Sequence, residues 1–422
     1  MDDTEVLVIG AGLAGLRCAD VLVSAGRDVR VWEAGDDVGG RIRTDVIDGF
    51  RCDRGFQVLN PAYPELSQAV DVSALRLQSF GAGVVVRRDE DSAVWVHPLR
   101  HPVRVPAMLS SGKITPRDLV AIARWATPAL RPKSLKAADR PDRSLRKALD
   151  RAGVRGEIRR VIDRFLAGVL LEDTGETSNA FALLLARMFL LGVPALPADG
   201  MQALPQQLAA RIDGRIALDR KVIRVERGVE GWLVHGEGGS VWARQVVVAT
   251  DAVAAASLTS ETVPKMHGVV TDWWATDHPV PGPPMLRVEG RRDPPGPVLS
   301  TAVISAAAPT YAPPGQQLIA ASALIERDGA EPAESVIREH AADILHSDHR
   351  GWRLLKRHVI RDALPAQPAP LTVRRPVRTP SGVWVCGDHR DTASIQGALV
   401  SGRRTAEAIL GTVGARAFRA TA

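Results

Sequence analysis

The hydrophobic pattern of the chain is strand-like near both ends and mostly helix-like in the first half of its interior. Near the start, apolar residues run without interruption over 6–9, recur at helical spacing over 13–25 and alternate over 28–33. This succession predicts a βαβ unit, which normally takes about 30 residues.

Helical spacing dominates the Arg-rich stretch 98–210. Within it the pattern predicts amphipathic helices over 143–152 and 157–166, and a strongly apolar helix over 178–191 with Ser178 as its N-cap. The remaining predicted elements are strands over 215–217, 222–227, 232–235 and 245–249, a Pro-rich, Trp-bearing segment over 264–297, a helix over 334–345, a strand over 382–387 and a helix over 396–410.

The longest uncharged run, 298–325, is long enough to cross a membrane as a helix. Pro309, Pro313 and Pro314 interrupt it, so it is predicted to form two strands around a turn. This hairpin and a helical insert lie between two ends of alternating strands and helices. We therefore expect an α/β fold in which a Rossmann-type domain is interleaved with a mixed helical and β-sheet domain.

A glycine-rich loop joins the first strand to the first helix. The sequence Gly10-Ala11-Gly12-Leu13-Ala14-Gly15 matches GxGxxG in the context that supports a dinucleotide site. Gly10 permits the tight turn, Gly12 lets the backbone approach a pyrophosphate, and Gly15 lets the helix pack on the strand. Glu33, at the end of the second strand, is placed to bind a ribose diol and to repel the 2′-phosphate of NADP.

A second motif follows directly in Gly39, Gly40, Arg41 and Arg43. The glycine pair lets backbone N–H groups approach a phosphate, and either arginine can neutralise it with a planar fork. A simple NAD dehydrogenase does not need this second clamp, whereas FAD in an extended conformation does. The sequence therefore favours FAD.

Composition and charge exclude several other classes. With 45% hydrophobic residues the 422-residue chain can bury a large core, and 4% aromatic residues argue against an aromatic platform for nucleic acid. The 54 basic residues are offset by 48 acidic ones, which gives no basis for DNA binding. No metal site is predicted, since the three cysteines lie far apart and Pro98 and Pro102 disrupt the helix that would pair His97 with His101. The acidic N-terminus suggests no signal peptide and a cytoplasmic protein.

The motifs together resemble the superfamily of flavin-containing amine oxidases, phytoene desaturases and protoporphyrinogen oxidases. The resemblance rests on GAGLAG, GGRIRT, GMQAL at 200–204, CGD at 386–388 and SIQGA at 394–398, in that order along almost the whole chain. The segments DRGFQVL at 53–59 and YAPPG at 311–315 look most like bacterial phytoene-desaturase-related oxidoreductases. Implied boundaries are FAD-binding parts at 1–70, 200–262 and 371–422, and substrate-domain parts at 71–199, which is mostly helical, and 263–370.

The resemblance also implies roles for individual residues. Val222 would meet the adenine through its backbone, and Asp388 after Gly387 would bind the ribityl or phosphate region. Gln396, Gly397 and Ala398 would place the start of the last helix under the pyrimidine end of the flavin, where its dipole would stabilise negative charge. The segment Gly55, Phe56 and Gln57 would lie near the isoalloxazine ring, with Gln57 bonding flavin or substrate or serving as an ordinary loop amide.

Substrate contacts are harder to predict. Trp273, Trp274 and Tyr311 could line a pocket or lie in the core. Many relatives carry a lysine beside the flavin, and Lys265 lies in about the corresponding region. Its local sequence matches poorly, so Lys265 is more simply a surface lysine. Cys386 does not match the flavin-linked cysteine of monoamine oxidases, so the FAD is expected to be non-covalent. No catalytic residue is assigned.

The leading hypothesis is an FAD-dependent oxidoreductase that removes two electrons from a hydrophobic small molecule, an isoprenoid or polyene, as hydride to flavin N5. The alternative is an amine oxidase that produces an imine and hydrogen peroxide; a flavoprotein without catalysis and a NAD-only dehydrogenase are further readings. The electron acceptor, oxygen or a quinone, stays open. A basic amphipathic segment over 114–136 could also contact an anionic membrane, or could be an ordinary solvated helix.

Overall fold

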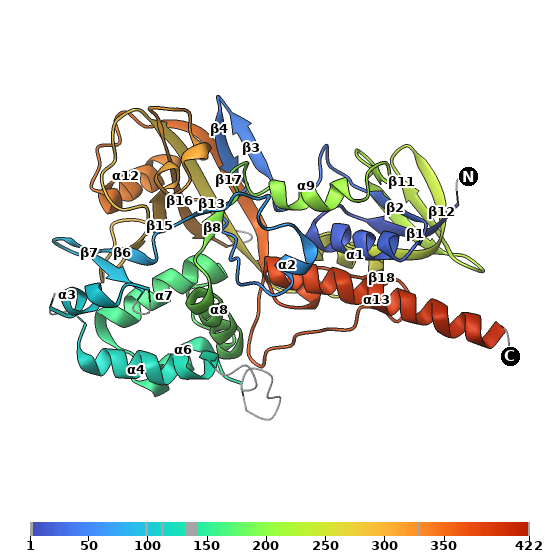
Figure 1. Ribbon diagram of the computed structural model, residues 1–422, viewed down its shortest axis with the longest axis horizontal. Helices are drawn as coiled ribbons and strands as arrows, with labels where there is room; N and C mark the ends of the chain where they lie inside the picture. The colour runs from blue at the N-terminus through green and yellow to red at the C-terminus, as the bar shows by residue number, and fades with distance from the viewer. Residues whose placement is uncertain (1–2, 98–99, 111–113, 131–141, 327–328, 421–422) are drawn as a thin grey trace.

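The computed structural model describes residues 3–97, 100–110, 114–130, 142–326 and 329–420. It has two lobes side by side, each built on a seven-stranded sheet (Figure 1). The chain passes between the lobes several times, because the first sheet takes strands from the start, the middle and the end of the sequence.

The first sheet has the strand order β10–β11–β12–β1–β2–β9, with β18 beside β12. Strands β12, β1, β2 and β9 run parallel, and β10 and β11 add an antiparallel edge. Its strands are β1 (Thr4–Ile9), β2 (Val29–Trp32), β9 (Ile216–Ala217), β10 (Val222–Arg227), β11 (Trp232–Gly236), β12 (Gly239–Val248) and β18 (Trp384–Val385), and the helices of this lobe are α1 (Leu13–Ser24), α9 (Ala203–Ala210), α10 (Ala252–Thr259) and α13 (Ile395–Ala420).

The continuous apolar runs of β1 and β12 are buried on both faces, as parallel strands require. Helix α1 buries Leu16 and Leu22 against the sheet, and α13 crosses α1 so closely that a Cβ on Gly402 would lie 2.2 Å from the carbonyl oxygen of Ala14. The two ends of the chain are thereby packed together in one core.

The second sheet has the order β17–β13–β16–β15–β14–β6–β7 and is antiparallel except where β14 runs parallel to β6. Helices α7 and α8 lie beneath it and α12 packs on it on the far side of the lobe (Figure 1). Its strands are β6 (Gly83–Arg87), β7 (Ser92–Val96), β13 (Met266–Thr276), β14 (Leu286–Glu289), β15 (Val298–Val303), β16 (Gln317–Ile325) and β17 (Arg353–Pro365), and the helices of this lobe are α3 (Val105–Ser110), α4 (Pro116–Ala126), α6 (Leu145–Ala152), α7 (Gly156–Leu170), α8 (Asn179–Leu191), α11 (Ile304–Ala307) and α12 (Glu334–Leu345).

Short elements join the lobes. They are β3 (Thr44–Ile47), β4 (Phe50–Asp53), α2 (Leu66–Ala69), β5 (Gln78–Ser79), β8 (Ala195–Leu196) and the 3₁₀ turns η1 (Pro102–Arg104), η2 (Thr127–Leu130), η3 (Pro309–Tyr311) and η4 (Asp388–Arg390).

The α/β fold class is confirmed, and so are the βαβ unit, the helix over 334–345 and the Ser178 cap, whose hydroxyl accepts from the N–H of Phe181 at 3.2 Å. The uncharged run forms the hairpin β15–β16. Sequence reasoning missed the long strands β13 and β17. Strand β17 carries many charged side chains, which hid the alternation typical of a strand. Such side chains are tolerated there because β17 lies at the edge of the sheet.

Candidate active site

A large cavity of about 910 Å³ lies between the lobes. Its floor is formed where the parallel strands of the first sheet end, which is where open α/β sheets bind ligands. It continues between the second sheet and helices α7 and α8. The cavity therefore has a nucleotide-binding part in one lobe and a chamber in the other.

The two glycine-rich loops meet at the first part. Gly12 and Gly39 form a parallel β-bridge, and the N–H of Gly39 donates to the carbonyl of Ala11 at 2.8 Å. A Cβ on Gly12 would have no atom within 4 Å, whereas one on Gly15 would lie 2.0 Å from the carbonyl oxygen of Gly10. Gly15 thus allows helix α1 to contact the strand, while Gly12 borders open space in front of the helix N-terminus, where no side chain among the described residues caps it. This cradle fits a pyrophosphate.

Glu33 stands beside this cradle. Its two carboxylate oxygens accept from the N–H of Ala11 at 2.6 Å and of Gly35 at 2.9 Å, which fixes the side chain at the cavity wall. Val222, at the start of β10, lines the same end of the cavity. A held carboxylate beside a backbone strand suits the ribose and the adenine of a dinucleotide.

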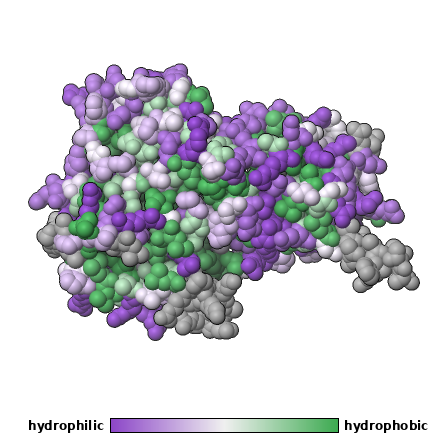
Figure 2. Space-filling view, in the orientation of Figure 1, coloured by the Kyte–Doolittle hydropathy of each residue, from purple (hydrophilic) through white to green (hydrophobic). Residues whose placement is uncertain are grey.

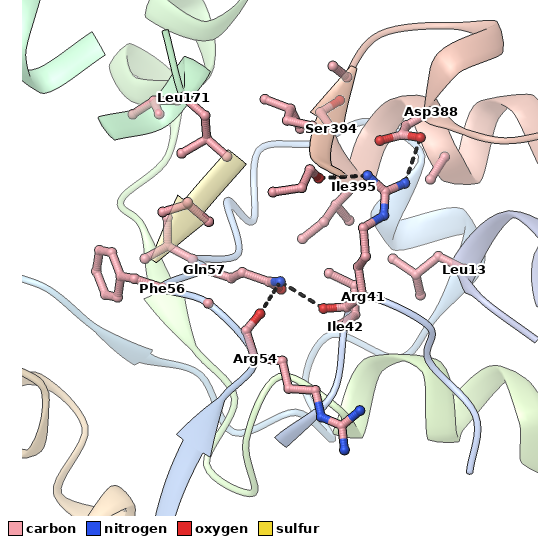
Figure 3. Close-up of a pocket in the computed structure, with 18 of the residues that line it drawn as sticks. Leu13, Arg41, Ile42, Arg54, Phe56, Gln57, Leu171, Asp388, Ser394 and Ile395 are labelled. Carbon is pink, nitrogen blue, oxygen red and sulfur yellow. Dashed lines mark hydrogen bonds and ion pairs between the residues drawn. The ribbon is translucent and has the colours of Figure 1, made fainter. Parts of the chain in front are cut away.

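Arg41 and Asp388 pair with each other at the cavity wall (Figure 3). The guanidinium donates to Asp388 Oδ1 at 2.7 Å and to the carbonyl of Ala363 at 2.7 Å. Although burial opposes its charge, the nearby Asp388 carboxylate raises the pKa of Arg41 above its ordinary value. Arg41 is therefore committed to a protein carboxylate, and Arg43 pairs with the exposed Asp36 away from the cavity.

Gln57 points into the space between Arg41 and Arg54 (Figure 3). Its Nε2 donates to the carbonyls of Arg41 at 2.8 Å and Arg54 at 3.1 Å, and its Oε1 is buried without a hydrogen-bond partner in the described parts of the chain. An acceptor left free at the cavity wall is suited to an N–H of the bound flavin. Phe56 turns away from Gln57 and packs edge-on against Phe80, with 6.1 Å between the two ring centroids.

The start of α13 also reaches the cavity. Ser394, Ile395 and Ala398 line it, whereas Gln396 turns outward and accepts from the N–H of Glu65 at 3.0 Å. Gly397 does not line the cavity. It packs against the preceding turn, where a Cβ would lie 1.9 Å from the carbonyl oxygen of Thr392.

The structure brings most of the predicted cofactor residues to one cavity. Those that line it are Gly10, Gly12, Ala14, Glu33, Gly39, Gly40, Arg41, Gly55, Phe56, Gln57, Val222, Gly387, Asp388 and Ala398, and those that do not are Gly15, Arg43, Gln396 and Gly397.

Trp274 and Tyr311 do not line the cavity, and this corrects their prediction as substrate contacts. Both are fully buried, Trp274 against Trp352 on the far side of β13 and Tyr311 with its hydroxyl on Asp53 at 2.9 Å. Trp273 is likewise a core residue, and Lys265 is exposed and outside the cavity.

The chamber is lined instead by residues that sequence reasoning did not assign. Its apolar wall comprises Val84, Trp95, Phe165, Val169, Leu185, Met188, Phe189, Leu286, Leu299 and Leu324. The strong apolar pattern of 178–191 pointed to part of this wall.

The three cysteines of the chain are all buried, and none lines the cavity. Burial and the nearby Asp53 and Asp45 carboxylates raise the pKa of Cys52 to about 12, so that thiol is not nucleophilic.

Within the described part of the chain, one group of side chains has metal-ligand chemistry, namely Glu289, His340 and Asp343. Arg291 donates to Glu289 at 2.6 Å and also pairs with Asp343, and His340 contacts the same Glu289 oxygen at 2.9 Å. The carboxylates are thus held by an arginine, and the group lies outside the cavity.

Comparison with known proteins agrees with this geometry. Putrescine oxidase from Kocuria rosea is 38% identical over 96 residues, which cover 23% of this chain and 19% of that protein. The 4,4′-diapolycopene oxygenase of a Methylomonas species is 40% identical over 73 residues, 17% of this chain and 14% of that protein. The aligned stretches thus span less than a fifth of these curated relatives.

The solved structure of an oxidoreductase from Methanosarcina mazei superimposes with a TM-score of 0.73 over 96% of this chain and 100% of that one, at 18% identity, which shows a common fold. A family model described as flavin containing amine oxidoreductase matches residues 13–410. The family prediction is confirmed: the chain belongs to the flavin containing amine oxidoreductases, and FAD is its cofactor.

Proposed function

We propose that the protein is an FAD-dependent oxidoreductase that dehydrogenates a hydrophobic small molecule, of the isoprenoid or polyene type. The apolar chamber, which is continuous with the cofactor part of the cavity, carries this proposal. FAD, which the glycine loops and Glu33 would hold, would supply the two-electron acceptor. The role of the protein's own residues is to orient an apolar chain and to exclude water.

The carboxylates of the cavity support an uncharged reacting group. Among the described lining residues, the acidic ones are Glu33, Asp251 and Asp388, and each follows a strand of the first sheet. Each is already bonded, Glu33 and Asp251 to backbone N–H groups and Asp388 to Arg41. None lies on α7, α8, β6 or β7, so the chamber offers no counter-ion to an ammonium group.

An amine oxidase that forms an imine and hydrogen peroxide is the alternative. The partial identity to putrescine oxidase favours it. The two functions differ in what reduces the enzyme and in what is released.

The test uses the FAD-loaded enzyme. Anaerobic bleaching of the flavin absorbance by an isoprenoid substrate supports the proposal, with oxygen or a quinone then screened as the acceptor. Peroxide release with a diamine, without bleaching by any isoprenoid, would replace it with the alternative.

Contact with an anionic membrane is a further part of the proposal. Helix α4 turns Leu119, Ile122 and Trp125 toward the helical core, but Arg117, Val120 and Arg124 lie exposed along its other side. Figure 2 shows hydrophobic residues gathered on the surface of this helical lobe. Among the described residues, no helix is long and apolar enough to cross a bilayer. The other basic residues predicted for this surface, Lys113, Arg131, Lys133 and Lys136, lie outside the described residues.

A further inference from the structure

Buried hydrogen-bond donors without acceptors among the described residues lie on the cavity wall. Asn60 and Trp95 line the cavity there and are only 3% and 8% exposed. Asn60 Nδ2 and Trp95 Nε1 are buried and have no hydrogen-bond partner among the described residues. Leaving buried donors unpaired is costly, so such groups point to a ligand or to water.

His97 adds a third polar group to this wall. It follows Trp95 by two positions at the end of β7, lines the cavity, and has both ring nitrogens buried without a partner within the described ranges. Burial and the nearby Arg100 and His101 lower the pKa of His97. The ring is therefore neutral at pH 7, with one N–H to donate.

Arg100 supplies the positive charge. Its Nη2 donates to the carbonyl of Leu191, the last residue of α8, at 3.1 Å, which holds the guanidinium at the chamber wall and leaves its other N–H groups available. Asn60 lies against the next residue, since a Cβ on Gly192 would be 2.1 Å from Asn60 Oδ1. Asn60 and Arg100 thus flank the end of α8.

From this arrangement, which rests on the proposed function, we infer that the apolar substrate carries a carboxylate that binds to Asn60, His97 and Arg100. Donors from three side chains, one of them the charged and solvent-exposed Arg100, match a planar anion with several lone pairs. The acidic residues that line the cavity follow strands of the other sheet and are already bonded. The substrate class is therefore a long-chain or isoprenoid carboxylic acid, held by its head group while its chain runs along α7 and α8 toward Phe56 and Gln57.

The test is a titration of the FAD-loaded enzyme with dodecanoate, methyl dodecanoate and dodecan-1-ol, followed by the change in flavin absorbance. Charge-assisted hydrogen bonds should make the acid bind about 10- to 100-fold more tightly than the ester or the alcohol. Arg100→Met should remove this preference and leave the affinity for the ester unchanged. Asn60→Asp, which keeps the Oδ1 that accepts from Ala62 at 3.0 Å, should weaken binding of the acid alone.

Arg104→Met is the matched control, because Arg104 lies one turn away, is exposed and does not line the cavity. Equal affinity for acid and ester, or an equal loss in the Arg100 and Arg104 variants, would overturn the inference while leaving the proposed function in place. If none of the three compounds changes the flavin spectrum, the proposal of an apolar substrate fails, and the carboxylate site fails with it.

Discussion

Arg41 and Asp388 lie 347 positions apart in the sequence and meet at the cavity wall, with Arg41 Nη2 2.7 Å from Asp388 Oδ1. The carboxylate is almost fully buried, and the pair joins the second glycine-rich loop to the turn after β18. These two motifs, each predicted to contact the cofactor, are thus connected to each other.

The first prediction concerns this pair. Arg41→Met leaves Asp388 buried without its charged partner, which typically costs about 3 kcal/mol or more. We expect a lower thermal midpoint and an FAD dissociation constant raised by about tenfold or more, since 1.4 kcal/mol corresponds to a factor of ten. Arg43→Met, which removes an arginine paired with exposed Asp36 outside the cavity, should change neither quantity. Equal behaviour of the two variants would show that the Arg41–Asp388 pair is dispensable.

The second prediction separates two glycines of one motif. Gly12 has φ −75° and ψ 175°, which any residue adopts, and its Cβ would enter open space. Gly12→Ala should therefore fold normally and lose FAD, because the methyl group occupies the place of the phosphates. Gly15→Ala should lower the stability of the apoprotein itself, since its Cβ would lie 2.0 Å from Gly10 O. Thermal unfolding of both apoproteins and their flavin content distinguish the two effects; retention of FAD by Gly12→Ala would contradict the assignment of the cradle.

The third prediction concerns a substitution that fills the chamber. Gly168 lies on α7 at the cavity, and a Cβ there would meet only Ser300 Oγ, at 3.5 Å. Gly168→Leu should keep or raise stability, because glycine costs up to about 1 kcal/mol in a helix, and should leave FAD binding unchanged. It should abolish anaerobic flavin reduction by apolar substrates. Unchanged reduction kinetics would place the substrate elsewhere.

The fourth prediction concerns pH. Burial raises the pKa of Asp53 to about 6 from 3.8, although Thr44, Met201 and Tyr311 donate hydrogen bonds to its carboxylate. Between these values the folded protein holds a proton that the unfolded chain has lost, so stability should fall as the pH rises from about 4 to about 6. The full difference corresponds to about 3 kcal/mol.

Asp53→Asn should remove this part of the decline, which thermal midpoints measured from pH 4.5 to 7.5 will show. Tyr311→Phe, which deletes one donor to the carboxylate, should raise the pKa of Asp53 further and extend the decline to higher pH. A variant Asp53→Asn with the same pH profile as the wild type would mean that Asp53 titrates at its ordinary pKa in the folded protein.

The nucleotide half of the cavity could be predicted from the sequence because its signals are local. Gly10, Gly12 and Glu33 lie within one βαβ unit, and their spacing follows from the geometry of that unit. Gly15 was predicted to let the helix pack on the strand, and its close approach to Gly10 agrees with that role. Gly397 was assigned to the cofactor although it packs against Thr392, since a glycine in the sequence does not tell a close ligand from a close backbone.

The chamber could not be predicted in the same way. Asn60 and Arg100 come from separate segments, and the end of α8 brings them to one wall, since Arg100 bonds to Leu191 and Asn60 lies against Gly192. Trp274 and Tyr311 were predicted as candidates for the chamber wall because aromatic side chains suit an apolar pocket. Aromatic side chains also suit a protein core, and both residues lie in the core.

The close crossing of α1 and α13 has a consequence for the order of assembly. The glycine loop and the segment formed by β18 and the start of α13 lie far apart in the sequence and line the same cavity. A fragment that ends before β18 would carry the whole nucleotide fingerprint and would lack part of the cavity wall. Stable retention of the coenzyme should therefore require these two distant segments to dock first.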